Sequence, residues 1–124
     1  MPQDRVSGAA ANTWGHAMAQ KVAKHLGATL VGNKNSNEAN WKGKSISIKS
    51  ARDRNTLIGV TLPILNRVQS VVAALQEPDG TFSLFESSSS WYRNQMRVPT
   101  NKPNIGMVRC DLIRSNGKAL GLMK

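Results

Sequence analysis

Glu38, Ser47 and Lys49 are the strongest candidates in this sequence for a reactive site. Acidic residues are scarce, with 7 Asp and Glu against 17 Lys and Arg, so an isolated carboxylate stands out. Glu38 lies in a polar, turn-rich segment among asparagines and lysines. A carboxylate in such a basic setting either pairs with a cation or ligates a divalent metal ion. The sequence leaves both roles of Glu38 open.

Ser47 and Lys49 belong to a predicted strand over residues 45–50. Ile46 and Ile48 alternate there with polar residues, which is the period of a strand with one buried face. Ser47 and Lys49 therefore share the face opposite to the two isoleucines. The ammonium group of Lys49 either serves a phosphate group there or is an ordinary solvated lysine, and the sequence does not separate these roles.

The other reactive side chains indicate no separate site. Cys110 is the only cysteine, so it offers no disulfide or zinc pair, and we expect a core thiol. His16 and His25 lie nine positions apart on one predicted helix and do not share a face. No glycine-rich phosphate loop is present. Asp53 could join Lys49 only if the intervening chain folded back.

The periodicity near the N-terminus predicts one helix. Residues 1–11 are small and polar and are expected to be loose. A helix is predicted over residues 12–26, because apolar residues recur every four positions and Gly27 follows directly. The recurring residues are Trp14, Met18, Val22 and Leu26, and a neighbouring face carries His16, Gln20 and Lys24.

The clearest predicted helix begins at Thr61 and runs to about Leu75. Its apolar residues follow the i, i+3, i+4, i+7 rule, Thr61 can cap it, and Pro63 is acceptable in its first turn. The other predicted elements are strands over 28–31 and 81–86, an apolar segment over 57–60, a helical turn over 91–96, a loop over 98–105, and a hairpin made by 107–113, a turn at 115–117 and 119–123.

This order of elements predicts an α+β (or α/β) fold, a small mixed β-sheet flanked by helices. The order is α-β-β-β-α-β plus a C-terminal β-hairpin extension. A chain of 124 residues suits a single domain, with a core over 12–86 and an extension over 87–124. No stretch approaches the ~20 apolar residues of a membrane span, and the first residues lack the apolar run of a signal peptide. We therefore expect a cytoplasmic protein that contacts no membrane.

The motif Glu38 … Ser47-Ile48-Lys49 and this order of elements resemble the restriction-endonuclease-like PD-(D/E)xK nuclease superfamily, over roughly residues 12–86. The resemblance implies a metal-dependent endonuclease, in which two carboxylates hold Mg²⁺ and the lysine orients water or stabilises charge. Glu38 matches the first acidic position and metal ligand, and Lys49 matches the motif lysine. Ser47 stands where the second carboxylate belongs. His16 or Gln20 would take the place of a further residue on the first helix, and the helix after the motif offers Asn66, Arg67 and Gln69 but no acid.

The net charge of +10 predicts a polyanionic partner, because cationic surfaces bind phosphates with release of counterions. DNA or RNA is the partner we predict, and an acidic protein or no polyanion at all are the alternatives. Aromatic side chains among cations also suit stacked bases. The predicted nucleic-acid-binding residues are Trp41, Lys42, Lys44, Arg52, Arg54, Arg93 and Arg97.

Three functions follow from these patterns. The first is a Mg²⁺-dependent endonuclease, which on a DNA duplex would act as a homodimer that cuts both strands. The second is a non-catalytic nucleic-acid-binding protein of the same fold, which the missing second carboxylate favours. The third is a metal-independent ribonuclease toxin with His16 and Lys49 as acid–base groups.

Overall fold

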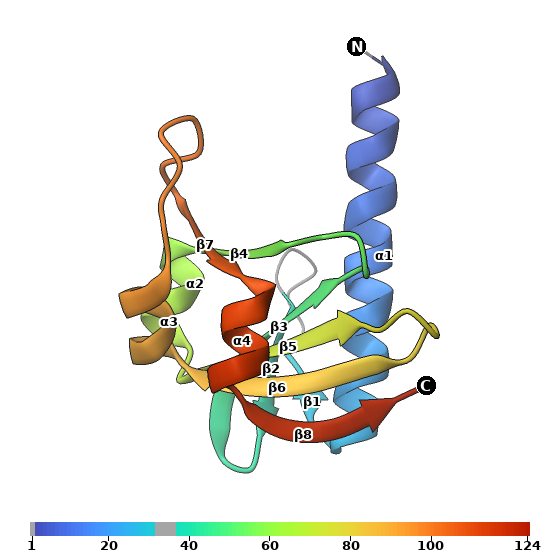
Figure 1. Cartoon of the computed structure of the whole chain (residues 1–124), viewed down its shortest axis with the longest axis vertical. Coiled ribbons are helices and arrows are strands. Elements are labelled where there is room, and N and C mark those ends of the chain that lie inside the picture. Colours follow the sequence, from blue (N-terminus) through green and yellow to red (C-terminus); the bar gives the residue numbers. More distant parts are fainter. Residues whose placement is uncertain (1, 32–36) are drawn as a thin grey trace.

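Strands form the centre of the fold and helices lie on both sides of them (Figure 1). This computed structural model describes the backbone of residues 2–31 and 37–124, and the side chains from Thr13 onward within them. In chain order the elements are α1 (Pro2–Leu26), β1 (Thr29–Leu30), β2 (Glu38–Trp41), β3 (Lys44–Ala51), β4 (Leu57–Thr61), α2 (Leu62–Arg67), β5 (Ser70–Gln76), β6 (Phe82–Ser88), α3 (Ser89–Gln95), β7 (Ile105–Arg109), α4 (Cys110–Asn116) and β8 (Lys118–Met123).

The main sheet is mixed, with the strand order β1-β2-β3-β5-β6-β8. β2 and β3 form an antiparallel hairpin, whereas β3 and β5 run parallel. A parallel pair needs a crossover connection, which β4 and α2 provide. β4 pairs with β7 in a separate antiparallel sheet. The predicted α+β class, a small mixed sheet flanked by helices, is therefore confirmed.

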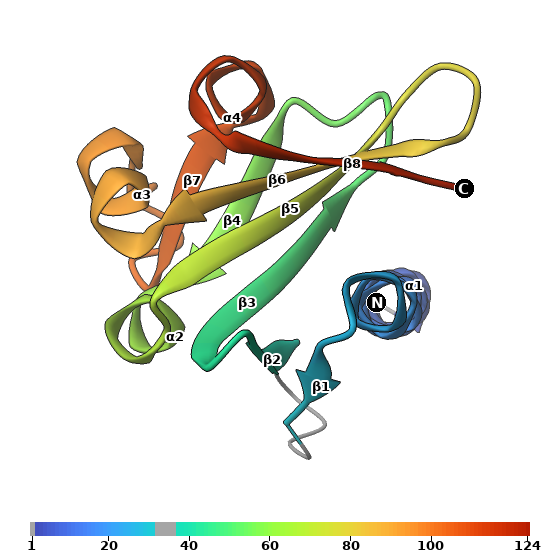
Figure 2. The same cartoon turned by 90° about the horizontal axis from the view of Figure 1, so that it is seen from below.

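Two apolar clusters lie on the two faces of the main sheet. On one face Ile46 and Ile48 of β3 pack with Val22 of α1, and Met123 of β8 joins the same cluster. On the other face β5 packs against β4, β7 and the three short helices. Figure 2 shows α1 on one side of the sheet and α2, α3 and α4 on the other. Successive side chains of β3 therefore face opposite sides of the sheet, one toward α1 and the next toward the short helices.

The predicted helix from Thr61 to Leu75 is wrong in its second half. α2 ends at Arg67, and residues 70–76 form β5. This strand lies inside the sheet and is buried on both faces, with Val71 in one cluster and Val72 in the other. A strand that is apolar on both faces produces helical spacing by chance, so periodicity alone cannot distinguish the two.

The predicted C-terminal hairpin is also wrong. α4 separates β7 from β8, and these strands pair with β4 and β6 rather than with each other. Cys110 and Ile113 are both buried on α4. Their spacing of three residues is helical, but in so short a segment it could be mistaken for the alternation of a strand. Gly117 caps this helix, because its N–H donates to the carbonyl of Ile113.

The first helix is longer than predicted. α1 begins at Pro2 rather than at Asn12 or Thr13, so the segment expected to be loose has helical backbone. Proline is acceptable in the first turn of a helix, where its missing N–H would have no partner. Within the described residues, no helix combines the length and apolar character needed to cross a membrane.

The remaining elements follow the predictions closely. The strand predicted over 45–50 is β3, and the apolar segment 57–60 is β4. The strands expected over 28–31 and 81–86 are β1 and β6, and the helical turn over 91–96 is α3.

Tyr92 joins α3 to the strands β4 and β7, and its replacement tests the contribution of this contact to stability. Its hydroxyl lies 2.8 Å from the carbonyl oxygen of Gly106 in β7 and 3.3 Å from that of Ile58 in β4. Tyr92→Phe leaves buried carbonyls without this donor and should lower the free energy of unfolding by about 1–2 kcal/mol. Urea unfolding measures the change, with Ser90→Ala on the exposed side of α3 as control. Equal stability of the two variants would contradict the assignment.

Candidate functional site

The β2–β3 hairpin brings the three predicted site residues to one face of the sheet. Glu38 pairs directly with Ser47 in the antiparallel register, and directly opposed residues share a face. Lys49 follows two positions along β3 and therefore shares it as well. Ile46 and Ile48 point to α1, so this face is the one turned away from α1. We call Glu38, Ser47, Lys49 and Arg67 the β2–β3 site.

Arg67 joins this site from the last turn of α2. Its Nε and Nη2 atoms each donate a 2.7 Å hydrogen bond to a different oxygen of the Glu38 carboxylate. The Glu38 side chain is 12% exposed, and the Arg67 side chain is 52% exposed. A bidentate arginine–carboxylate pair fixes both groups in direction as well as distance. Of the two roles left open for Glu38, the ion pair is present.

The position of Arg67 follows from the crossover between β3 and β5. The chain returns from α2 to the beginning of β3, where Ser45 donates from its hydroxyl to the carbonyl of Arg67 at 3.2 Å. The N–H of Gln69 donates to the carbonyl of Ser45 at 2.9 Å. Sequence reasoning noted Arg67 only as a residue that is not an acid. One signal could have predicted its contact with Glu38. Arg67 is a cation that shortly precedes β5, and β5 begins beside β3 and the β2–β3 hairpin that carries Glu38.

The residues of the β2–β3 site do not fit Mg²⁺ in this arrangement. Mg²⁺ requires several oxygen ligands in near-octahedral geometry. Arg67 occupies both oxygens of Glu38, and the residue opposite is Ser47, which is buried and carries no carboxylate. In the part of the chain that is described, no three His, Cys, Asp or Glu side chains lie close enough together to hold a metal.

Lys49 is a half-buried cation. Burial lowers the pKa of its ammonium group below the ordinary value for lysine, because desolvation penalises the charged form. No carboxylate opposes this effect: across the described residues, no hydrogen bond or ion pair involves the ammonium group. A half-buried charge without a counter-charge is unfavourable unless a ligand supplies one.

His16 and Gln20 do not join Lys49. The His16 Nδ1 atom lies 3.2 Å from the side-chain oxygen of Asn37, and Gln20 Nε2 lies 3.4 Å from His16 Nε2. These residues belong to α1, which covers the face of Ile46 and Ile48. The sheet therefore lies between the His16 ring and the face of Lys49, which disfavours the pair of acid–base groups expected of a ribonuclease.

Asp53 is no substitute for the missing carboxylate. It lies exposed in the loop after β3, where its backbone N–H donates to the side-chain oxygen of Gln76 at 3.2 Å. The loop is held toward β5 and does not return along β3 to Ser47.

The predicted basic segment divides between the two ends of β3. Lys42 and Lys44 lie at its beginning and Arg52 and Arg54 follow its end. At about 3.3 Å per residue, the eight-residue strand separates them by roughly 23 Å. Residues close in sequence are therefore far apart in space, and no single patch collects them.

Trp41 is a core residue and not a stacking platform. It is 6% exposed and belongs to the apolar cluster under α1. Its indole N–H donates to the carbonyl of Leu26 at 3.2 Å. The ammonium groups of Lys42 and Lys44 lie 4.9 and 5.3 Å from its ring centre. Cations thus cover the part of the ring that a base would need, and we remove Trp41 from the predicted interface.

The other predicted binding residues lie at the surface. Arg52 stacks over the ring of Trp14, with its Cζ atom 4.4 Å from the ring centre. Arg93 donates to the carbonyl of Leu65 at 2.7 Å, which attaches α3 to α2. Arg54 and Arg97 are exposed, and neither has a hydrogen-bonded side-chain partner among the described residues.

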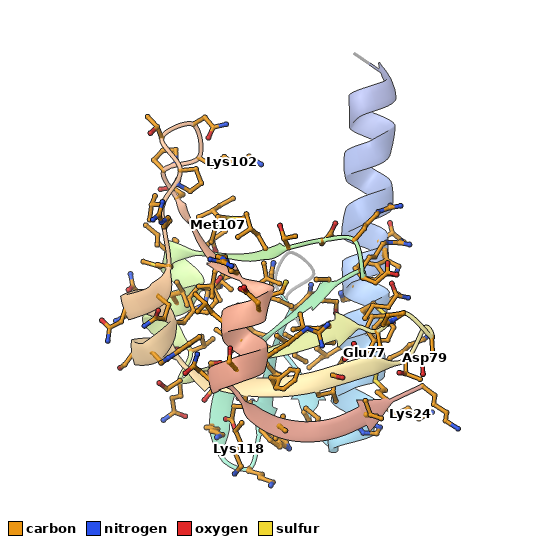
Figure 3. The ribbon with its side chains drawn as sticks, in the orientation of Figure 1. Lys24, Glu77, Asp79, Lys102, Met107 and Lys118 are labelled. Carbon is orange, nitrogen blue, oxygen red and sulfur yellow. The ribbon has the colours of Figure 1, made fainter. Side chains whose placement is uncertain are left out.

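Most of the acidic side chains already have cationic partners. Burial of the Glu86 carboxylate opposes its ionisation, but hydrogen bonds from Lys44 and Ser70 and the charge of Lys118 still hold its pKa below the usual range. Figure 3 places Lys102 far from Lys24 and Lys118, at the other end of the molecule. The excess positive charge is thus spread over the surface. Among the described residues, ion pairs join Glu38 to Arg67, Glu77 to Arg114, Glu86 to Lys44 and Asp111 to Arg109.

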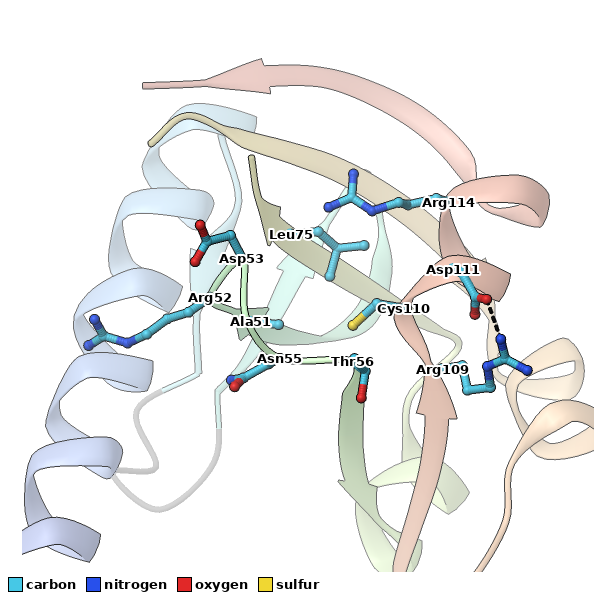
Figure 4. Close-up of a pocket in the computed structure, with 10 residues that line it drawn as sticks. All are labelled: Ala51, Arg52, Asp53, Asn55, Thr56, Leu75, Arg109, Cys110, Asp111 and Arg114. Carbon is cyan, nitrogen blue, oxygen red and sulfur yellow. Dashed lines mark hydrogen bonds and ion pairs between the residues drawn. The ribbon is translucent and has the colours of Figure 1, made fainter. Parts of the chain in front are cut away.

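A cleft of about 230 Å³ lies where β3 ends, and Cys110 forms part of its wall. Figure 4 shows the sulfur of Cys110 directed toward Ala51. Arg109 and Arg114 also line the cleft, but each pairs with a carboxylate. The burial of Cys110 confirms the expected core thiol. Burial raises the pKa of this thiol, Asp111 adds to the rise, and Arg114 opposes it.

No protein-family model matches this chain, and no curated protein matches it. Its function is therefore inferred from its own residues.

Replacing Lys49 should stabilise the protein. Lys49→Met removes a poorly solvated charge and should raise the free energy of unfolding at pH 7 by about 1 kcal/mol. The lowered pKa of Lys49 means that the folded state releases this proton first, so the wild type gains stability as pH rises through that pKa. The difference between variant and wild type should therefore shrink toward pH 10. Urea unfolding at several pH values measures it, with exposed Lys102→Met as control, and a destabilised Lys49→Met would contradict the assignment.

The Cys110 thiol should be slow to react. Burial and a raised pKa leave little accessible thiolate, so iodoacetamide at pH 8 should modify the native protein at least about tenfold more slowly than the protein in urea. Mass spectrometry follows the modification, with a short cysteine peptide as the control for reagent reactivity in each solvent. Equal rates for native and unfolded protein would show that Cys110 is exposed.

Proposed function

We propose that this protein binds the sugar–phosphate backbone of nucleic acid. The observation that carries the proposal is the distribution of charge. Four of the seven acidic residues are already paired with cations, while Lys42, Arg52, Arg54, Arg93 and Arg97 lie exposed. A surface of this kind attracts a polyanion from every side and gains free energy by releasing its counterions.

A nucleic acid suits this surface better than an acidic protein does. The exposed cations lie at both ends of β3 and at both ends of the molecule, so their partner must carry charge at regular intervals over a long distance. A phosphate backbone does so, with one charge per ≈ 1.7 Å of duplex axis. Because the ring of Trp41 is covered, the proposal concerns backbone contacts, which position a protein without reading sequence.

A metal-dependent endonuclease is the second candidate, and the register of the β2–β3 hairpin favours it. Glu38 opposes Ser47, and Lys49 follows on the same face, as the resemblance to the PD-(D/E)xK superfamily implies for its motif. The parallel β3–β5 pair with α2 in its crossover also matches the order of elements that this resemblance implies. The occupied carboxylate of Glu38 and the serine at position 47 are what weigh against it.

Two further parts of the proposal concern the setting of the protein. A single buried cysteine suits a reducing compartment, and we propose the cytoplasm. The homodimer expected for cleavage of a duplex stays a prediction that belongs to the second candidate.

Binding to a DNA duplex of about 20 base pairs and to tRNA tests the proposal. Affinity should fall steeply between about 50 and 200 mM salt. The double variant Arg52→Gln/Arg54→Gln should reduce the slope of log K against log salt by about 2, if each arginine contacts one phosphate. Asn55→Ala in the same loop is the uncharged control. Absence of binding to either nucleic acid at low salt would exclude the proposed function.

Cleavage assays separate the second candidate from the first. Plasmid DNA and tRNA are incubated with the protein in Mg²⁺ and in EDTA. Binding without cleavage in either buffer is the expected result. Cleavage that requires Mg²⁺ and disappears in Glu38→Ala would establish the endonuclease instead, and cleavage of tRNA in EDTA would establish the ribonuclease.

A further inference from the structure

We propose that Arg67 takes the place of a metal ion in the β2–β3 site, so that Arg67 and Lys49 bind a backbone phosphate group without any divalent cation. This inference rests on the proposed function and names the site at which the nucleic-acid backbone binds. It also gives Glu38 the role of a positioning residue, which orients the guanidinium group of Arg67 and ligates no metal.

The guanidinium group of Arg67 retains donors for a ligand. Arginine has five N–H donors in a planar fork, and two hydrogen bonds go to Glu38. Among the described residues no other acceptor is bonded to this group, and more than half of the side chain is exposed. The remaining N–H donors of Arg67 therefore lie on the side of the guanidinium group that faces away from the Glu38 carboxylate. Such a fixed fork matches the oxygens of a phosphate group.

Lys49 supplies the second cation on the same face. Ser47 lies opposite Glu38, the partner of Arg67, and Lys49 follows about 7 Å further along β3, at about 3.3 Å per residue. Its half-buried ammonium group has no counter-charge among the described residues, and a phosphate oxygen would provide one. Arg67 and Lys49 thus lie on the same sheet face as the buried hydroxyl of Ser47. They form a defined site, unlike the scattered lysines of the surface.

The charge of the site decides between an anion and a metal. Glu38 contributes one negative charge, while Arg67 and Lys49 contribute one positive charge each, so the site carries about +1. A divalent cation would be repelled by this charge and would also have to displace a bidentate arginine. A phosphodiester, with one negative charge, neutralises the site. The chemistry of the site therefore selects the phosphodiester.

Arg93 extends the site along the surface of α2. Its Nη2 atom donates to the carbonyl of Leu65 and to the side-chain oxygen of Asn66, at 2.7 and 3.0 Å. These bonds hold the exposed Arg93 on the turn that carries Arg67. Arg93 is therefore the residue that we propose for a further phosphate of the same strand.

A double substitution that leaves the net charge unchanged tests the inference. Glu38→Gln/Arg67→Gln removes one charge of each sign and leaves an amide pair of similar size, so general attraction to a polyanion is preserved. We expect it to bind the DNA duplex about tenfold more weakly than the wild type in EDTA, since it lacks one charge-assisted phosphate contact. Asp111→Asn/Arg109→Gln removes the exposed pair Arg109–Asp111 and is the matched control, with affinity expected to be unchanged.

Three more measurements complete the test. Urea unfolding shows that each double variant is folded, and Arg67→Lys, which keeps the charge but loses the fork, should also weaken binding severalfold. A titration with Mg²⁺ should leave the affinity of the wild type unchanged or lower it, because Mg²⁺ competes for the DNA phosphates. Wild-type affinity in Glu38→Gln/Arg67→Gln, or tighter binding as Mg²⁺ is added, would overturn the inference while the proposed function stands. Failure of the wild type to bind would instead overturn the proposed function.

Discussion

The parallel pairing of β3 with β5 determines where the neighbouring elements of the fold lie. It obliges the chain to leave the end of β3, cross the sheet through β4 and α2, and return to the beginning of β3. That return places the last turn of α2 beside the β2–β3 hairpin and brings Arg67 onto Glu38. It also buries β5 on both faces, which divides the apolar core into two layers.

The ion pair between Glu38 and Arg67 holds two elements of the fold together, and under our proposal it also orients a phosphate-binding group. The carboxylate is nearly buried, so its desolvation must be offset by the hydrogen bonds of the guanidinium group. The same bonds hold the exposed side of Arg67 in one orientation. Lys49 is different, because burial disfavours its charge and no neighbouring carboxylate relieves it. The charge of Lys49 therefore lowers the stability of the protein when no ligand is bound. Charged groups in such unfavourable surroundings are typical of binding sites.

Local patterns predicted the face of each residue in β3, but they did not predict which elements meet. Alternation around Ile46 and Ile48 placed Ser47 and Lys49 correctly, because a strand with one apolar face has an unambiguous period. The same reasoning failed for β5, where both faces are apolar. Closeness in sequence grouped Lys42 and Lys44 with Arg52 and Arg54, although the extended strand β3 separates the two pairs in space. Arg67 could not be assigned to Glu38, since their contact depends on a long-range crossover that no local signal encodes.

The cluster beneath α1 joins residues that are far apart in the chain. Met18 and Val22 of α1 belong to the same apolar cluster as Met123 of β8, the strand at one edge of the main sheet. Contacts between such distant residues require the closure of a large loop, which slows the folding of a chain. We therefore expect Met123 to join this cluster late, after Ile46 and Ile48 of β3 have already covered the apolar face of α1.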